Sequence, residues 1–142
     1  MALHELIYVS LAVREMDTSD LSALLDESRA FNEAHDITGM LIYHRQEFMQ
    51  LLEGDEAEIL ALYEKIRKDA RHHEVIKYWD GPIKARSFAA WSMAFVAPEA
   101  SELRKRPGYE ALLEQGLAAS LGDSTGRRLL VMVRKDFLRA DD

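Results

Sequence analysis

The chain has 142 residues, of which 18 are Lys or Arg and 25 are Asp or Glu, so the formal net charge is −7. Apolar residues make up 48% and charged residues 30%, as in one ordinary globular domain. The absence of cysteine excludes disulfides, cysteine-ligated metals and a cysteinyl–cofactor adduct. An acidic chain without a Lys/Arg stripe predicts no nucleic-acid partner. No signal-peptide pattern and no membrane-span pattern is present, so we expect a cytoplasmic protein without a membrane partner.

Five segments show the alternation, or the β-branched and aromatic content, of β-strands. They are residues 3–10, 37–43, 48–53, 74–83 and 88–96. A short polar turn joins the second and third segments into a hairpin, which Gly54 should end.

Two helices should separate these strands. The capping residues at 17–20 start the first helix, which should run to about His35. Asp55 and Glu58 predict a capping box for the second helix, which should end at about Ala70. The order is β-α-β-β-α-β with one extra strand, so the predicted fold class is α+β and ferredoxin-like, with both helices on one face of the sheet.

Two apolar blocks near the C-terminus, residues 109–121 and 129–138, predict further helices, although the start of the second block also suits a strand. We expect these helices to cover the free face of the sheet, where Ile7 and Val9 lie. The residues expected to help cover it are Leu112, Leu113 and Leu117.

Polar residues interrupt the buried side of the strand patterns. Gln50 shares a face with Phe48 and Leu52, and a buried amide without a partner would cost about 1–3 kcal/mol. Tyr8 lies on one face of the first strand. Its hydroxyl can reach Gln50 if the first and third strands are neighbours.

Further polar and aromatic residues fall on the same side. Leu24, Ser28 and Asn32 form one line along the first helix, and the last predicted strand brings Trp91 and Met93 to a common face. Taken alone, each of these residues is most simply interpreted as a core residue whose polar groups form hydrogen bonds with neighbouring side chains. Together they form an apolar slot with converging polar groups, which is typical of a small-molecule site.

Six segments follow one another in a distinctive order. They are 6–10 (LIYVS), Ser28-Arg29 with Asn32, 37–41 (ITGML), 48–54 (FMQLLEG), Asp69 with Arg71-His72, and 91–93 (WSM). In this order and spacing they resemble the BLUF family of blue-light sensors that use flavin. The resemblance covers about residues 3–96, which assigns 1–97 to a sensor domain and 98–142 to a C-terminal extension.

The resemblance implies a ferredoxin-like domain that binds FAD or FMN non-covalently, with FAD favoured. The flavin ring would lie between Leu24 and Ile66, with Asn32 at its carbonyl edge and Gln50 between the ring and Tyr8. Tyr8 would donate an electron and a proton to the photoexcited flavin. The other flavin contacts implied are Ser28, Leu52, Lys65, Asp69 and Arg71, and the residues expected to report the change at Gln50 are Trp91 and Met93.

Physical chemistry agrees with this interpretation. Without cysteine, flavin photochemistry leaves reversible proton-coupled electron transfer from a nearby Tyr or Trp. Reversing a glutamine amide swaps a hydrogen-bond donor for an acceptor, which makes a small two-state element. Two positions depart from the family pattern, because Phe31 replaces a polar residue and Lys65 stands where some relatives have Arg. Both bear on the choice between FMN and FAD.

Other functions remain open at this point. The connection over 11–16 has no glycine for a phosphate-binding loop, and no second nucleotide motif accompanies the flavin pattern, so we expect no enzymatic activity. His72-His73 predicts no metal site, because neighbouring strand residues point to opposite faces. The alternative is a light-insensitive flavin-binding or interaction module. Residues 97–142 leave no room for an output domain. We therefore expect an effector protein in trans and a homo-oligomer.

Overall fold

The computed structural model describes residues 2–44, 46–89, 92–97, 101–105 and 107. Within these ranges, five strands, two α-helices and one short 3₁₀ helix follow one another. In order, they are β1 (Leu3–Ala12), α1 (Thr18–Ala34), β2 (Thr38–His44), β3 (Glu47–Asp55), α2 (Glu56–Arg67), β4 (His72–Pro82), β5 (Ala94–Val96) and η1 (Ser101–Lys105). None of the helices in these ranges is long and apolar enough to cross a membrane.

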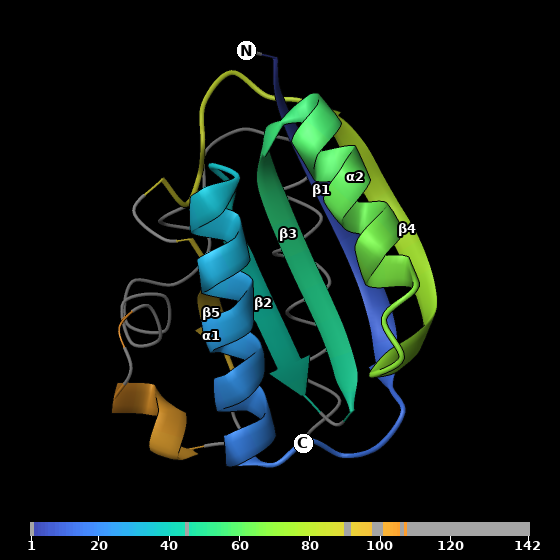
Figure 1. Ribbon diagram of the computed structural model, residues 1–142, viewed down its shortest axis with the longest axis vertical. Helices are drawn as coiled ribbons and strands as arrows, with labels where there is room; N and C mark the ends of the chain where they lie inside the picture. The colour runs from blue at the N-terminus through green and yellow to red at the C-terminus, as the bar shows by residue number, and fades with distance from the viewer. Residues whose placement is uncertain (1, 45, 90–91, 98–100, 106, 108–142) are drawn as a thin grey trace.

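The strands form one sheet in the order β4-β1-β3-β2-β5. All neighbours are antiparallel except β2 and β5, which run parallel. Figure 1 shows both α-helices on the same face of this sheet, α1 over β2 and α2 beside β1 and β4. The predicted α+β, ferredoxin-like arrangement is therefore confirmed, with β5 as the extra strand at the β2 edge.

The face of the sheet away from the helices carries an apolar strip. The register places Ile7, Leu51 and Met40 side by side across three strands. The fully buried side chains of this strip are Ile7, Met40, Ile42, Met49 and Leu51, and Val9 is half-buried. The predicted C-terminal helices, with Leu112, Leu113 and Leu117, lie outside the described residues.

The two helix starts differ. Asp17 caps α1: its side chain accepts a bond from the Asp20 backbone N–H at 2.8 Å, and the Asp20 carboxylate accepts from Asp17 N at 3.1 Å. Asp55 is the N-cap of α2, but its side chain makes no capping bond. The predicted capping box with Glu58 is wrong, because that carboxylate turns to His35 Nδ1 at 2.7 Å.

Five predicted boundaries also need correction. β1 runs to Ala12 instead of Ser10, and β4 begins at His72 instead of Glu74. β3 continues through Gly54 to Asp55, and α2 ends at Arg67 instead of Ala70. The last strand spans only Ala94–Val96, because the described residues directly before it form a turn and bends. Met93 therefore precedes β5, and period-2 alternation does not decide where its side chain points.

The segment between β4 and β5 is held by long-range hydrogen bonds instead of strand pairing. The buried Glu53 carboxylate accepts from the backbone N–H groups of Ser87 at 2.8 Å and Phe88 at 2.6 Å. Arg86 donates to Thr38 Oγ1 at 3.0 Å and to the backbone oxygen of Asp36 at 2.8 Å. These bonds fix one end of the segment that leads to Met93, whose sulfur accepts a hydrogen bond from Gln50.

Candidate functional site

A cavity of about 160 Å³ lies between α1 and α2, above the middle of the sheet. Its walls are mainly apolar, with polar groups at the floor and the mouth. The lining residues are Tyr8, Leu24, Glu27, Ser28, Phe31, Asn32, Leu41, Phe48, Gln50, Leu62, Lys65, Ile66, Asp69, Arg71 and His72. Nine of the ten residues that the sequence pointed to as flavin contacts thus meet at one cavity.

Tyr8 and Gln50 lie directly opposite each other on β1 and β3. Both side chains are nearly inaccessible to water, and the Tyr8 hydroxyl donates a short hydrogen bond to Gln50 Oε1. Burial is the main reason that the pKa of Tyr8 is raised well above its ordinary value, and the Asp69 carboxylate adds to the rise. The phenol is therefore neutral at physiological pH, with its proton directed at an amide oxygen.

The other end of the Gln50 amide faces Met93. Gln50 Nε2 donates to Met93 Sδ at 3.5 Å, and Met93 is fully buried. Arg29 on α1 donates to the Met93 backbone oxygen through Nε at 3.0 Å and through Nη2 at 2.8 Å. Trp91, the other residue expected here, lies outside the described residues.

Leu24, Ser28 and Asn32 bring one line of α1 to the cavity. Asn32 is the buried member, and its Nδ2 donates to the Ser92 backbone oxygen at 2.7 Å. This bond uses one of the two amide N–H groups. The remaining N–H and Oδ1 form a neighbouring donor and acceptor on the cavity wall.

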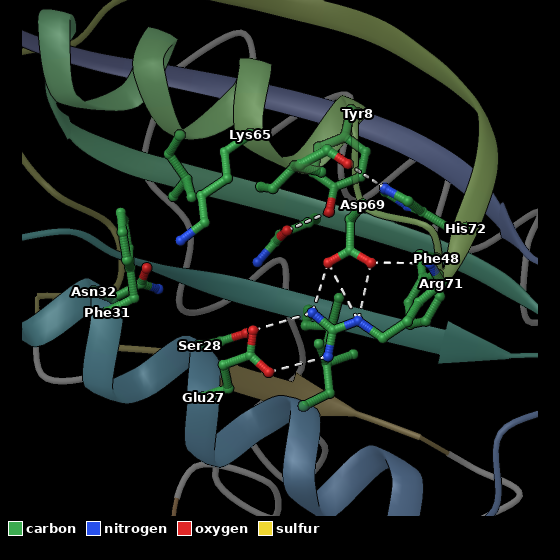
Figure 2. A pocket seen from close by; sticks show the side chains of 15 residues that line it. Tyr8, Glu27, Ser28, Phe31, Asn32, Phe48, Lys65, Asp69, Arg71 and His72 are labelled. Atoms are coloured by element: carbon green, nitrogen blue, oxygen red, sulfur yellow. Dashed lines mark hydrogen bonds and ion pairs between the residues drawn. The ribbon is translucent and has the colours of Figure 1, made fainter.

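Residues of α2 and the turn after it line the opposite wall and the mouth. Lys65 and Ile66 come from the last turn of α2, and Asp69 and Arg71 from the connection to β4. Arg71 binds Asp69 through Nη2 at 2.6 Å and Glu27 of α1 through both terminal nitrogens at 3.1 Å each (Figure 2). The hydrogen bond from Arg71 holds the pKa of Asp69 below its usual value.

Leu52 is the one proposed flavin contact that is not part of the cavity lining. It is fully buried in the core one pleat beyond Gln50. His72 also lines the cavity, although no pattern in the sequence marked it as a flavin contact. Its Nε2 donates to the backbone oxygen of Ile66, so its Nδ1 accepts from Ser10 Oγ at 2.7 Å. The sequence signal that could have identified His72 is its position directly after Arg71, which was predicted to contact the flavin.

The residues present fit a flavin. Leu24 and Ile66 offer apolar walls, and Asn32 offers a donor beside an acceptor, which suits the imide edge of the ring. Gln50 has an amide N–H beyond the one directed at Met93. The site is therefore that of a ligand-binding α+β domain whose polar groups could read one edge of a planar heterocycle.

Comparison with known proteins gives the family. The BLUF family model, described as sensors of blue-light using FAD, matches residues 3–94. The chain belongs to this family of flavin-dependent blue-light sensors.

Its curated relatives include much longer proteins. The chain is 38% identical over 95 residues to photoactivated adenylate cyclase subunit beta of Euglena longa, covering 66% of this chain and 11% of that protein. It is also 38% identical over 85 residues to subunit alpha of Euglena gracilis, covering 60% of this chain and 8% of that protein. The chain thus spans about a tenth of the length of these relatives.

Solved structures agree with the fold. The dark-state structure of the BLUF protein BlrB superposes with a TM-score of 0.67 at 29% identity, covering 93% of this chain and 97% of BlrB. Photo-activated BlsA gives a TM-score of 0.67 at 26% identity, with 93% of each chain covered. Klebsiella pneumoniae BlrP1 with FMN and cyclic diGMP gives 0.71 at 29% identity, covering 90% of this chain and 33% of BlrP1.

Proposed function

We propose that this chain is a blue-light receptor that binds FAD or FMN non-covalently, with FAD favoured, and signals by rearranging the hydrogen bonds of Gln50. The observation that carries the proposal is the buried Tyr8–Gln50 hydrogen bond on the wall of the cavity. Family membership supports the cofactor class. The proposed flavin contacts are the nine predicted residues that line the cavity together with Leu52, and Trp91 and Met93 are proposed to report the change at Gln50.

The chemistry assigned to the residues is a reversible transfer. Bound flavin supplies blue-light absorption and, once excited, the power to oxidise a phenol by one electron. Tyr8 would give up that electron and its phenolic proton, which would leave along the bond to Gln50 Oε1, with the bound flavin as the acceptor of both. When the electron and proton return, Tyr8 is a neutral phenol again and the Gln50 amide is left rotated or tautomerised.

The two ends of the Gln50 amide explain why the rearranged form would not persist. In the observed arrangement Oε1 accepts from Tyr8 and Nε2 donates to Met93 Sδ. Rotation turns Oε1 toward a thioether that has no hydrogen to donate, and an unmet buried carbonyl costs about 1–3 kcal/mol. When flavin is bound, the rotated amide would gain in return by donating to one of its carbonyl oxygens, and the balance between these bonds would set the lifetime of the signal.

Light-minus-dark absorption spectra of the purified, flavin-loaded protein test this proposal. We expect a small reversible red shift, because a new hydrogen bond to the flavin carbonyl stabilises the excited state more than the ground state. Gln50→Leu removes the amide with little change in volume, and Tyr8→Phe removes the transferable proton. Each variant should stay yellow and lose the long-lived red-shifted state.

Tyr63→Phe is the matched control. Tyr63 is a buried tyrosine whose ring centroid lies 5.9 Å from that of Tyr8, but it does not line the cavity. Its variant should keep the full shift. A full shift in Gln50→Leu would overturn the amide switch, and a flavin-free wild-type protein would favour a bare interaction module.

We further propose that the signal leaves by protein contact, to a separate effector or within a homo-oligomer, through residues 98–142. The named cyclase relatives carry their activity in far longer chains. A pull-down compared in light and dark would identify such a partner.

A further inference from the structure

Arg29 on α1 holds the chain on both sides of β5. Its Nε and Nη2 both donate to the backbone oxygen of Met93, at 3.0 and 2.8 Å, and Nη2 also donates to the backbone oxygen of Pro107 at 2.8 Å. The guanidinium carbon lies 5.6 Å from the centroid of the buried Phe95 ring. One charged group thus fixes the chain on which Met93 lies.

Arg29 lies behind the wall of the cavity. Its neighbours along α1, Ser28 and Asn32, are among the described residues that line the cavity, and Arg29 is not. Asn32 Nδ2 donates to the Ser92 backbone oxygen at 2.7 Å, so α1 holds the carbonyl groups of two consecutive residues, 92 and 93. An influence of Arg29 on Gln50 therefore passes through Met93.

Met93 is held at its backbone and contacts Gln50 with its side chain. Gln50 Nε2 donates to Met93 Sδ at 3.5 Å, and Met93 is fully buried. A thioether is a weak acceptor on a flexible side chain, so it defines a direction for the amide only if its residue is fixed. A planar guanidinium that donates twice to one oxygen provides such a fixed point, because these bonds are charge-assisted and directional.

We propose that Arg29 is a positioning residue for the light-driven switch, because it fixes Met93 where its sulfur meets the Gln50 amide. This inference rests on the proposed function, since it concerns how the Gln50 amide returns to its original arrangement. The bond to Pro107 holds the guanidinium from its other side. Figure 1 shows η1, which precedes Pro107, lying beside α1, so this contact joins neighbouring parts of the fold.

A fixed Met93 would shorten the lifetime of the rotated amide. In the rotated arrangement Gln50 Oε1 would face Met93 Sδ, and neither atom has a hydrogen to donate. While Arg29 holds Met93, the thioether cannot withdraw from this unfavourable contact, and the contact favours the original arrangement. Without Arg29, Met93 would shift, the contact would be relieved and the rotated amide would last longer.

Dark recovery after a blue-light pulse tests the proposal on the full-length, flavin-loaded protein. Arg29→Leu keeps an apolar side chain beside Phe95 but removes every donor. The red-shifted state should still form and should decay about tenfold more slowly than in the wild type, the scale of one hydrogen bond to a charged group. Arg29→Lys restores the charge but not the planar fork, so its decay rate should lie between these two.

Arg14→Leu is the matched control. It makes the same substitution at an exposed arginine, which pairs at 2.9 Å with Asp20 in the first turn of α1. It therefore removes the same charge and a contact to the same helix, but leaves the bonds to Met93 in place. Its decay rate should equal that of the wild type.

Methyl NMR of the flavin-free protein gives a second measurement, which does not depend on light. The chain has six methionines, and the Met93 methyl signal is the one that Met93→Leu lacks. Arg29→Leu should move this signal, because the chemical shift of the methyl carbon depends on the rotamer of the thioether, and Arg29→Lys should move it less. Met40 and Met49 are fully buried on the opposite face of the sheet, so their signals should stay in place.

The outcomes separate this inference from the proposed function. An unmoved Met93 signal or an unchanged decay rate in Arg29→Leu overturns the inference even if the light response is intact. Equal slowing in Arg14→Leu, or equal movement of the Met40 and Met49 signals, also overturns it, because either would show general loosening. A wild-type protein without a red-shifted state overturns the proposed function, and the Met93 signal of the flavin-free protein then still decides whether Arg29 positions Met93.

Discussion

Tyr8 illustrates how burial and proton chemistry are linked in a single residue. Its phenol is packed between Gln50, Tyr63 and His72, and burial is the largest cause of its raised pKa. The folded state therefore resists ionisation of this group far more than the unfolded chain does. The same burial that keeps the Tyr8 proton in the hydrogen bond to Gln50 makes the folded state less stable at alkaline pH.

The sign of that sensitivity follows from linkage. A phenol whose pKa is raised on folding contributes its full stability below the unfolded pKa, about 10, and loses it as pH rises further. At pH 11 the loss from such a group is about 1.4 kcal/mol. Urea unfolding at pH 8 to 11 should therefore show a shallower decline in Tyr8→Phe than in the wild type. Tyr78→Phe changes an exposed tyrosine in the same way and should show the same decline in the free energy of unfolding as the wild type. Equal declines in all three proteins would contradict the assignment of the alkaline sensitivity to Tyr8.

At this scale, regular periodicity determined which residues could be predicted. Gln50 and Asn32 could be assigned from the sequence because each lies within an uninterrupted strand or helix. His72 could not, because β4 pairs with β1 through two register shifts, and alternation cannot be counted through a bulge. Met93 lies in a segment placed by Arg29 and Glu53 from distant parts of the chain, which no local pattern encodes.

At the scale of elements, both α-helices have an Asp at the N-cap position, but only one of the two side chains makes a capping bond. Asp17 makes a reciprocal cap, whereas Asp55 makes no side-chain cap bond. The sequence predicted caps at both sites, because both carry acidic residues at the right spacing. It could not foresee that Glu58 would instead approach His35, since that contact forms only when the two helices lie side by side.

This difference gives a prediction about stability. Asp17→Ala should lower the free energy of unfolding by about 1 kcal/mol, the usual cost of an N-cap bond. Asp55→Ala should lower the free energy of unfolding by only a few tenths of a kcal/mol, because Asp55 contributes just a favourable charge near the start of the helix. Urea unfolding at neutral pH measures both. Asp17→Asn keeps the acceptor and should stay near the wild type, and similar losses at the two caps would argue against the difference.

At the scale of the whole molecule, the two faces of the sheet have separate roles. The helix face holds Tyr8 and Gln50 at the cavity floor, and the opposite face carries the fully buried strip that includes Ile7 and Met49. The five strands and the placement of both helices on one face of the sheet could be predicted, because they follow from strand patterns and one supersecondary motif. Cover of the opposite face by the C-terminal sequence is a prediction, and it is open to a direct test.

Deleting residues 108–142 provides that test, because it removes Leu112, Leu113 and Leu117 but keeps Leu103, which is buried near α1. We expect a lower melting temperature and aggregation, since each large apolar side chain returned to water costs about 1.5–3 kcal/mol and an open apolar strip promotes association. Flavin should still bind, because every described residue that lines the cavity lies before position 73. Deleting only residues 140–142 is the control and should change neither property. If the longer deletion left the melting temperature and solubility unchanged, the strip would not depend on these leucines, and residues 108–142 would be free to act on a partner without a role in stability.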